Sequence, residues 1–142
     1  MIMKDGVTGV VLDASFLTDV STGYRIEHEV LADRWSRQAV SVSVPQTELV
    51  LVERDKAGQA RAALELLLSR CGPSVLIRPL DMTAVEATAA TMRRYAVGDI
   101  AMAHTASIAI SANWTVYTTT PERYRQLGDT IDLFSLGGHV GN

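Results

Sequence analysis

The fold of this chain is decided by one segment near its start, Val7-Thr8-Gly9-Val10-Val11-Leu12-Asp13-Ala14-Ser15. Residues 7–12 are rich in apolar and β-branched side chains that do not alternate with polar ones, a pattern typical of a strand buried on both faces of a parallel sheet. The run stops at Asp13. Because ligands of an open α/β sheet gather beyond the carboxyl ends of its strands, we expect this acid to lie where such a sheet binds its ligand.

Outward from this segment, helical and extended patterns alternate along the chain. Apolar residues recur at helical spacing in residues 24–38, 56–70, 81–96 and 99–112. Shorter helices are expected after Asp13, after Pro45 and at residues 122–127. Buried strands are expected at residues 75–77, 114–118 and 130–134. Residues 40–44 alternate valine with serine and form either a short strand or an extended connector. This order predicts an α/β fold with a mainly parallel sheet covered by helices.

The bulk composition sets the limits of the interpretation. With 142 residues, 47% of them hydrophobic, we expect a single domain at residues 1–136 and a flexible, Gly-rich tail at residues 137–142. The single cysteine, Cys71, excludes an intrachain disulfide and is expected in the core. The sequence has neither a signal-peptide pattern nor an apolar run of the roughly 20 residues that span a membrane, so the cytoplasm is the expected compartment. The net charge of −3 means that any nucleic-acid contact must be local.

Three of the 16 acidic residues stand at positions that the sheet would bring together. Asp13 ends the first strand, Glu48 lies in the helix after Pro45, and Asp99 opens the helix that feeds a later strand. Buried carboxylates repel one another unless a cation joins them. Mg²⁺ and Mn²⁺ favour oxygen ligands and can activate water next to a phosphodiester. Composition alone does not select these three acids from the others.

Four segments resemble the PIN domain, the fold of the VapC-type toxins of bacterial toxin–antitoxin pairs. They are Val10-Val11-Leu12-Asp13-Ala14-Ser15, Val44-Pro45-Gln46-Thr47-Glu48-Leu49, Gly98-Asp99-Ile100-Ala101-Met102-Ala103-His104-Thr105-Ala106 and Thr115-Val116-Tyr117-Thr118-Thr119-Thr120-Pro121-Glu122-Arg123-Tyr124. Each motif alone is weak, but their order and spacing cover nearly the whole chain. The resemblance implies a three-layer α/β/α fold.

The resemblance also implies a function, namely a ribonuclease with Mg²⁺ or Mn²⁺ held by Asp13, Glu48 and Asp99. Ser15 and Thr118 would be supporting hydroxyls. An RNA substrate, a cognate antitoxin and a homodimer are implied as partners. The family's fourth acid falls on Thr120, a neutral and poorer ligand, which puts strong nuclease activity in question.

Several other polar and aromatic residues admit two interpretations. We interpret His28, His104, Trp35 and Trp114 as packing residues rather than as catalytic or base-stacking groups. Glu122 could compensate for Thr120, but a solvated charge in the first turn of a helix is the simpler interpretation. Arg123 and Arg125 either contact RNA phosphates or are exposed helix charges, and the second interpretation is preferred.

Two functions therefore remain in competition. The first is a metal-dependent endoribonuclease, the toxin of a VapBC-type system. The second is a catalytically weakened PIN-like protein that acts by binding RNA or a protein, for which Thr120 is the reason. A nucleotide-binding α/β protein does not fit, because the turn Asp13-Ala14-Ser15-Phe16 lacks a Gly-rich phosphate cradle and a P-loop lysine.

Overall fold

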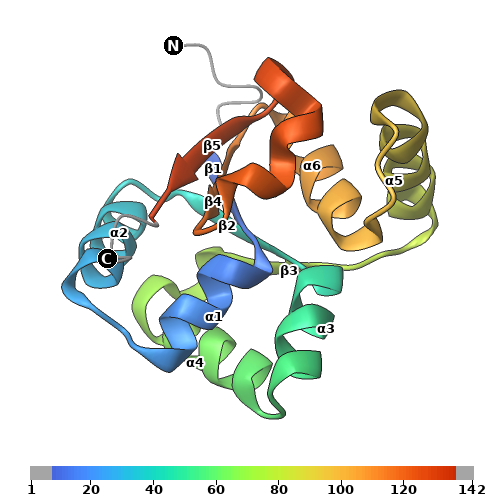
Figure 1. Cartoon of the computed structure of the whole chain (residues 1–142). Helices are drawn as coiled ribbons and strands as arrows, with labels where there is room; N and C mark the ends of the chain where they lie inside the picture. Colours follow the sequence, from blue (N-terminus) through green and yellow to red (C-terminus); the bar gives the residue numbers. More distant parts are fainter. Residues whose placement is uncertain (1–7, 137–142) are drawn as a thin grey trace.

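The computed structural model describes residues 8–136, which form a five-stranded sheet with the strand order β3-β2-β1-β4-β5 (Figure 1). The strands are β1 (Gly9–Leu12), β2 (Ser41–Pro45), β3 (Val75–Arg78), β4 (Thr115–Thr118) and β5 (Asp132–Ser135). All neighbouring strands in this part of the chain pair in parallel. The predicted parallel sheet is confirmed, while Val7 and the tail at residues 137–142 lie outside the described residues.

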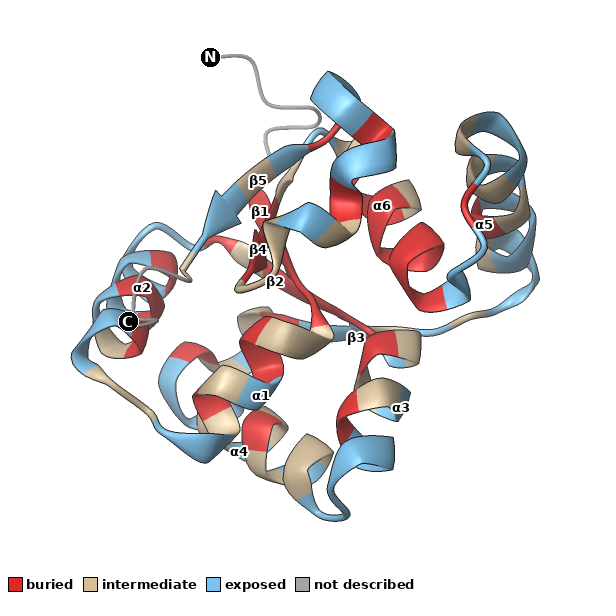
Figure 2. Cartoon of the chain, viewed as in Figure 1, coloured by how far each residue is buried: buried red, intermediate tan, exposed pale blue. Residues whose placement is uncertain are grey.

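Helices cover both faces of the sheet, which makes three layers (Figures 1 and 2). They are α1 (Ala14–Thr22), α2 (Ile26–Arg37), α3 (Gln46–Asp55), α4 (Gln59–Cys71), α5 (Met82–Tyr95) and α6 (Ile100–Ala112), with the 3-10 helices η2 (Gly72–Ser74) and η3 (Pro121–Thr130). Val10 and Leu12 of β1 pack with α1, α2 and α4, whereas Val11 packs with α6 and η3. Successive residues of β1 therefore serve opposite cores, as its apolar pattern predicted.

The segment with alternating valine and serine is a strand rather than a connector. Val42 and Val44 are buried in the same core as α1, and β2 lies between β1 and β3. Ser43 is also fully buried, and its hydroxyl accepts a hydrogen bond of 3.1 Å from Nη1 of Arg78. The serine is tolerated inside the sheet because this contact satisfies its polar group.

The apolar stripe expected on the helix at residues 81–96, made of Val85, Ala89, Met92 and Ala96, is only partly correct. Thr88 is the buried residue of α5, Met92 is partly buried, and Val85 is 42% exposed. The reason is that α5 packs against α6, whose residues are mostly small, rather than directly against the sheet.

Within residues 8–136, no helix combines the length and the apolar character needed to cross a membrane.

The strand order places a crevice next to β1. Its two neighbours are β2 and β4, and the chain leaves β1 through α1 on one face but leaves β4 through η3 on the other. The segments that follow β1 and β4 thus lie on opposite faces of the sheet, which separates them at the carboxyl ends of these two adjacent strands. Open α/β sheets bind their ligands at such a point. The backbone N–H of Asp13, just beyond β1, donates to the carbonyl of Tyr117 in β4, so these two strand ends lie side by side.

Candidate functional site

Asp13 is held at the end of β1 by four donors. It is the N-cap of α1, and its Oδ1 accepts hydrogen bonds from the Phe16 backbone N–H at 3.1 Å and from the Ser15 hydroxyl at 2.7 Å. Its Oδ2 accepts from the Tyr124 hydroxyl at 2.7 Å and from Nη1 of Arg123 at 3.4 Å. The carboxylate is fully buried, so these donors replace the water that it lost.

Glu48 lies beside Asp13 and is equally buried. Pro45 occupies the N-cap position of α3, so that Glu48 falls in the first turn of the helix. Its Oε1 accepts from the Ala14 backbone N–H at 2.9 Å and from Nη1 of Arg123 at 3.1 Å, and its Oε2 accepts from the Thr105 hydroxyl of α6. Glu48 thus joins α1, α3 and α6 at one point.

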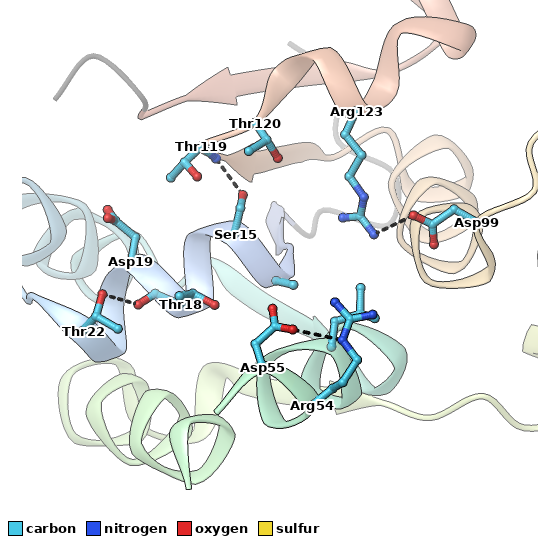
Figure 3. A pocket seen from close by; sticks show the side chains of 12 residues that line it. Ser15, Thr18, Asp19, Thr22, Arg54, Asp55, Asp99, Thr119, Thr120 and Arg123 are labelled. Atoms are coloured by element: carbon cyan, nitrogen blue, oxygen red, sulfur yellow. Dashed lines mark hydrogen bonds and ion pairs between the residues drawn. The ribbon is translucent and has the colours of Figure 1, made fainter. Parts of the chain in front are cut away.

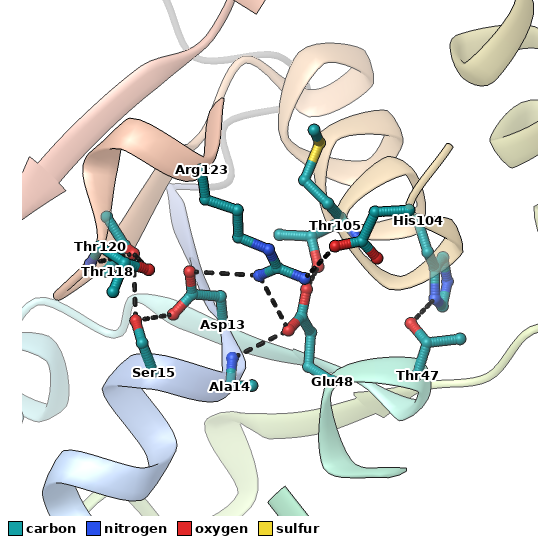
Figure 4. Close-up of polar contacts among 12 residues, drawn as sticks. Asp13, Ala14, Ser15, Thr47, Glu48, His104, Thr105, Thr118, Thr120 and Arg123 are labelled. Carbon is teal, nitrogen blue, oxygen red and sulfur yellow. Dashed lines mark hydrogen bonds and ion pairs between the residues drawn. The ribbon is translucent and has the colours of Figure 1, made fainter. Parts of the chain in front are cut away.

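Asp99 stands at the edge of the same site. It is the N-cap of α6, where its Oδ1 accepts from the backbone N–H of Met102 at 3.1 Å. Its side chain is 48% exposed, and its Oδ2 lies 3.4 Å from Nη2 of Arg123. The structure therefore brings together all three predicted acids, but it joins them through a guanidinium, which contacts Asp13 and Glu48 in Figure 4 and Asp99 in Figure 3.

The predicted supporting hydroxyls form a chain beside Asp13. The Ser15 hydroxyl lies 3.1 Å from that of Thr118 and accepts from the backbone N–H of Thr119 at 2.8 Å. Thr118 in turn accepts from the backbone N–H of Thr120 at 3.0 Å, and the two threonine hydroxyls are 3.4 Å apart. Thr120, at the expected position of the fourth acid, is thus part of the site and presents a hydroxyl there (Figure 4).

A cavity of about 610 Å³ opens above these residues. Its polar lining includes Ser15, Asp19, Arg54, Asp99, Thr120 and Arg123 (Figure 3). Of residues 8–136, those that line it include Arg123 and Asp99 but neither Asp13 nor Glu48. The two buried carboxylates therefore lie beneath the guanidinium rather than on the cavity wall.

The electrostatics of the site follow from burial and close charges. Burial raises the pKa of Glu48, the Arg123 guanidinium opposes this rise, and the charge of Asp13 adds to it. Burial also raises the pKa of Tyr124, as do the adjacent carboxylates of Asp13 and Glu48, so the phenol stays protonated and donates. Burial lowers the pKa of the Arg123 guanidinium, but Glu48, Tyr124 and Asp13 together raise it by more, so the net shift is upward. Arg123 is therefore a permanent cation at neutral pH.

The side chains at this site fit Mg²⁺ or Mn²⁺ by their chemistry, since three carboxylates and nearby hydroxyls supply the hard oxygen ligands that these ions prefer. Their present arrangement does not leave the oxygens free. Over the described part of the chain, no group of three or more His, Cys, Asp or Glu side chains is placed so that it could hold a metal ion. One oxygen each of Asp13, Glu48 and Asp99 is turned to Arg123 instead.

The sequence did not predict the roles of two residues of this site. Arg123 is not an exposed helix charge, because its side chain is only 17% exposed, and that preferred interpretation was wrong. Tyr124 is fully buried against Asp13, and the sequence assigned it no role beyond its place in the fourth segment. The structural reason is the 3-10 turn after Thr120: with three residues per turn, position 123 returns to the side of position 120, and no pattern in the sequence signals this.

The other residues with two interpretations behave as packing or surface groups. Trp35 and Cys71 are buried in the core, and the ring of Trp114 covers Gly9. His28 is buried and contacts Asp19 through Nε2 at 2.9 Å, and His104 is buried with its Nδ1 2.8 Å from the Thr47 hydroxyl. Glu122 and Arg125 are exposed.

Comparison with known proteins adds information on the fold alone. No model of a known protein family matches the sequence, and no curated protein matches it. Among solved structures, one match is VapBC2 from Rickettsia felis, which was solved bound to a DNA fragment from its promoter. The TM-score is 0.67 at 14% identity, over 90% of this chain and 98% of that chain. VapBC-1 from nontypeable Haemophilus influenzae matches with a TM-score of 0.58 at 15% identity over 90% and 98%.

VapC20 from Mycobacterium tuberculosis, described as a Sarcin-Ricin loop cleaving toxin, matches with a TM-score of 0.52 at 16% identity over 77% of this chain and 88% of that chain. The resemblance drawn from four short motifs is thus confirmed by coordinates that cover most of the chain. The chain therefore has the PIN fold of the VapC-type toxins.

Proposed function

We propose that the protein is a VapC-like toxin that cleaves RNA with the help of Mg²⁺ or Mn²⁺. The observation that carries the proposal is the convergence of Asp13, Glu48 and Asp99, from three separate segments, on one cation of the chain itself. Carboxylates gathered in this way destabilise a fold unless positive charge joins them. A site that must hold positive charge at the end of β1 is well suited to a metal-dependent hydrolase.

In this proposal, Asp13, Glu48 and Asp99 hold the cation. Bound there, the ion would supply a Lewis acid that polarises the phosphodiester and lowers the pKa of a water. The residues around the acids have a separate task. Ser15 and Tyr124 orient the carboxylate of Asp13, while Thr105 and the backbone N–H of Ala14 orient that of Glu48. The acids are thus positioned before any substrate arrives.

The decisive experiment is cleavage of RNA by the purified chain in the presence of Mn²⁺ or Mg²⁺. Asp13→Asn keeps the shape of the side chain and its N-cap role but removes the charge, so we expect it to abolish cleavage. Glu122→Gln removes an exposed acid close to the site and should cleave like the wild type. Equal cleavage by Asp13→Asn and the wild type would point to a contaminating nuclease and contradict the proposal.

The second candidate function is binding without efficient catalysis. Two observations favour it: Thr120 supplies a neutral hydroxyl where the family's fourth acid falls, and Arg123 fills the centre of the acids. This candidate predicts that the chain binds RNA in a gel-shift assay but neither cleaves it nor binds Mn²⁺ by calorimetry. Tight binding of Mn²⁺ that is lost in Glu48→Gln would exclude this second function.

The proposal includes a cytoplasmic location and two protein partners, a cognate antitoxin and a second copy of the chain. The solved VapBC structures support the antitoxin as a partner. In this chain, Ile26 and Val30 of α2 are 72% and 50% exposed and, four residues apart, share one face of the helix. Co-expression with the product of an adjacent short reading frame, followed by light scattering, tests both partners.

A further inference from the structure

The centre of the site is filled by one side chain, that of Arg123. Its Nη1 lies 3.4 Å from Oδ2 of Asp13 and 3.1 Å from Oε1 of Glu48, and its Nη2 lies 3.4 Å from Oδ2 of Asp99. A planar guanidinium can bridge several carboxylates at once, because its donors point in fixed and different directions. Arg123 therefore stands where a metal ion would share the same three acids.

Arg123 also closes access to the two buried acids. Asp13 and Glu48 have no exposed surface, whereas Arg123 and Asp99 line the cavity above them (Figures 3 and 4). A cation that entered from the cavity would meet the guanidinium before it reached Asp13 or Glu48. The positive charge of Arg123 would repel it.

On the two buried acids, each oxygen that faces Arg123 has one other donor, the Tyr124 hydroxyl at Oδ2 of Asp13 and the Ala14 backbone N–H at Oε1 of Glu48, so withdrawal of Arg123 would free one acceptor position on each. Oδ1 of Asp13 is occupied by Ser15 and the Phe16 backbone N–H, and Oε2 of Glu48 is occupied by Thr105. These donors belong to the packed elements α1 and α6, and removing them would disturb the fold. Arg123, by contrast, reaches the acids on a long and flexible side chain from η3. Of the partners of these acids, it is the one that can leave at least cost to the fold.

We infer that Arg123 is an internal counterion that competes with the divalent cation for Asp13, Glu48 and Asp99, so that metal binds only when the guanidinium withdraws. The inference rests on the proposed function, because it concerns the same three acids. It makes Arg123 a gate on the site. The cavity into which the side chain would move is also lined by Asp19 and Asp55, whose carboxylates pair with Arg25 and Arg54 and would be shared with the displaced guanidinium.

The test is the affinity of the intact chain for Mn²⁺, measured by titration calorimetry without RNA. Arg123→Gln removes the charge, and we expect it to bind Mn²⁺ more tightly than the wild type, by on the order of tenfold to a hundredfold. Arg125→Gln removes an exposed arginine two residues away and serves as the matched control. We expect its affinity to equal that of the wild type.

Arg123→Lys keeps a positive charge among the three acids. It provides a second test in case Arg123→Gln does not fold. A lysine ammonium is a point charge that cannot bridge three carboxylates in the same way, so the affinity for Mn²⁺ should rank Gln above Lys above Arg at position 123. A second measurement is thermal unfolding. We expect Mn²⁺ to raise the Tm of Arg123→Gln and Arg123→Lys more than that of the wild type.

The outcomes separate this inference from the proposed function. If the wild type binds Mn²⁺ as tightly as both variants, or if neither variant binds it, Arg123 is not a competitor and the inference fails. In the first case, Asp13-dependent cleavage of RNA would leave the proposed function standing. If the variants bind Mn²⁺ more tightly but no protein cleaves RNA, the inference holds and the ribonuclease proposal fails.

Discussion

The hydroxyl of Tyr124 donates a 2.7 Å hydrogen bond to Oδ2 of Asp13, across 111 positions of the sequence. Both side chains are buried, so water cannot take over this contact if the phenol is removed. The bond ties η3 to the carboxyl end of β1 and leaves the Asp13 carboxylate with a fixed orientation. It is therefore both a structural link and part of the candidate site.

Tyr124→Phe should lower the free energy of unfolding by about 1.5 to 3 kcal/mol, because a buried carboxylate loses a donor. Urea unfolding followed by circular dichroism measures this change. Tyr95→Phe, at a partly buried tyrosine of α5, is the control and should remain within about 0.5 kcal/mol of the wild type. An equal effect of the two substitutions would show that the bond to Asp13 contributes nothing to stability.

Thr120→Asp should restore the fourth acid and strengthen the binding of Mn²⁺ by about tenfold, since it adds a negative charge beside Thr118 and Ser15. Calorimetric titration gives the affinity. Thr119→Asp places the same charge one residue earlier on the wall of the same cavity. Similar gains in both variants would mean that bulk charge, rather than the position of residue 120, controls metal binding.

Acid should destabilise the fold through its buried histidines. Burial lowers the pKa of His104 below its usual 6.5, and the charge of Arg78 adds to this effect. As the pH falls below about 6.5, the unfolded chain therefore takes up the proton before the folded chain does. Protonation then favours the unfolded state, and the free energy of unfolding decreases. Burial lowers the pKa of His28 as well, with the same sign.

Urea unfolding between pH 7.5 and pH 5 measures this dependence. One proton contributes a slope of at most about 1.4 kcal/mol per pH unit. His104→Gln removes one of the two titrating groups and should flatten the curve in this window. An unchanged slope would mean that His104 keeps its ordinary pKa in the folded chain.

Gly9→Ala should destabilise the protein by about 1 to 3 kcal/mol. A Cβ at this position would lie 2.5 Å from Cδ2 and Cε2 of Trp114, so the indole ring would have to move. Gly23→Ala is the matched control, because a Cβ there meets no atom of the described chain within 4 Å. Thermal unfolding of the two variants compares them, and equal Tm values would show that Trp114 moves freely.

The sequence by itself determined the order of helices and strands, the parallel sheet and the position of Asp13 at the end of β1. These features depend on local patterns: an apolar run buried on both faces, helical spacing, and a proline directly before α3. The resemblance of four motifs then placed Glu48 and Asp99 near Asp13. The structure agrees, because all three acids contact one side chain.

Only the tertiary structure decided what joins these acids. Arg123 meets carboxylates that lie 24, 75 and 110 positions away in the sequence, and no local pattern encodes that destination. A long charged side chain in a short helix is usually solvated, so its sequence context predicts exposure. Here the 3-10 turn after Thr120 aims it at two buried negative charges, whose attraction outweighs the loss of its hydration. Long-range electrostatics, rather than periodicity, places the cation at the centre of the site.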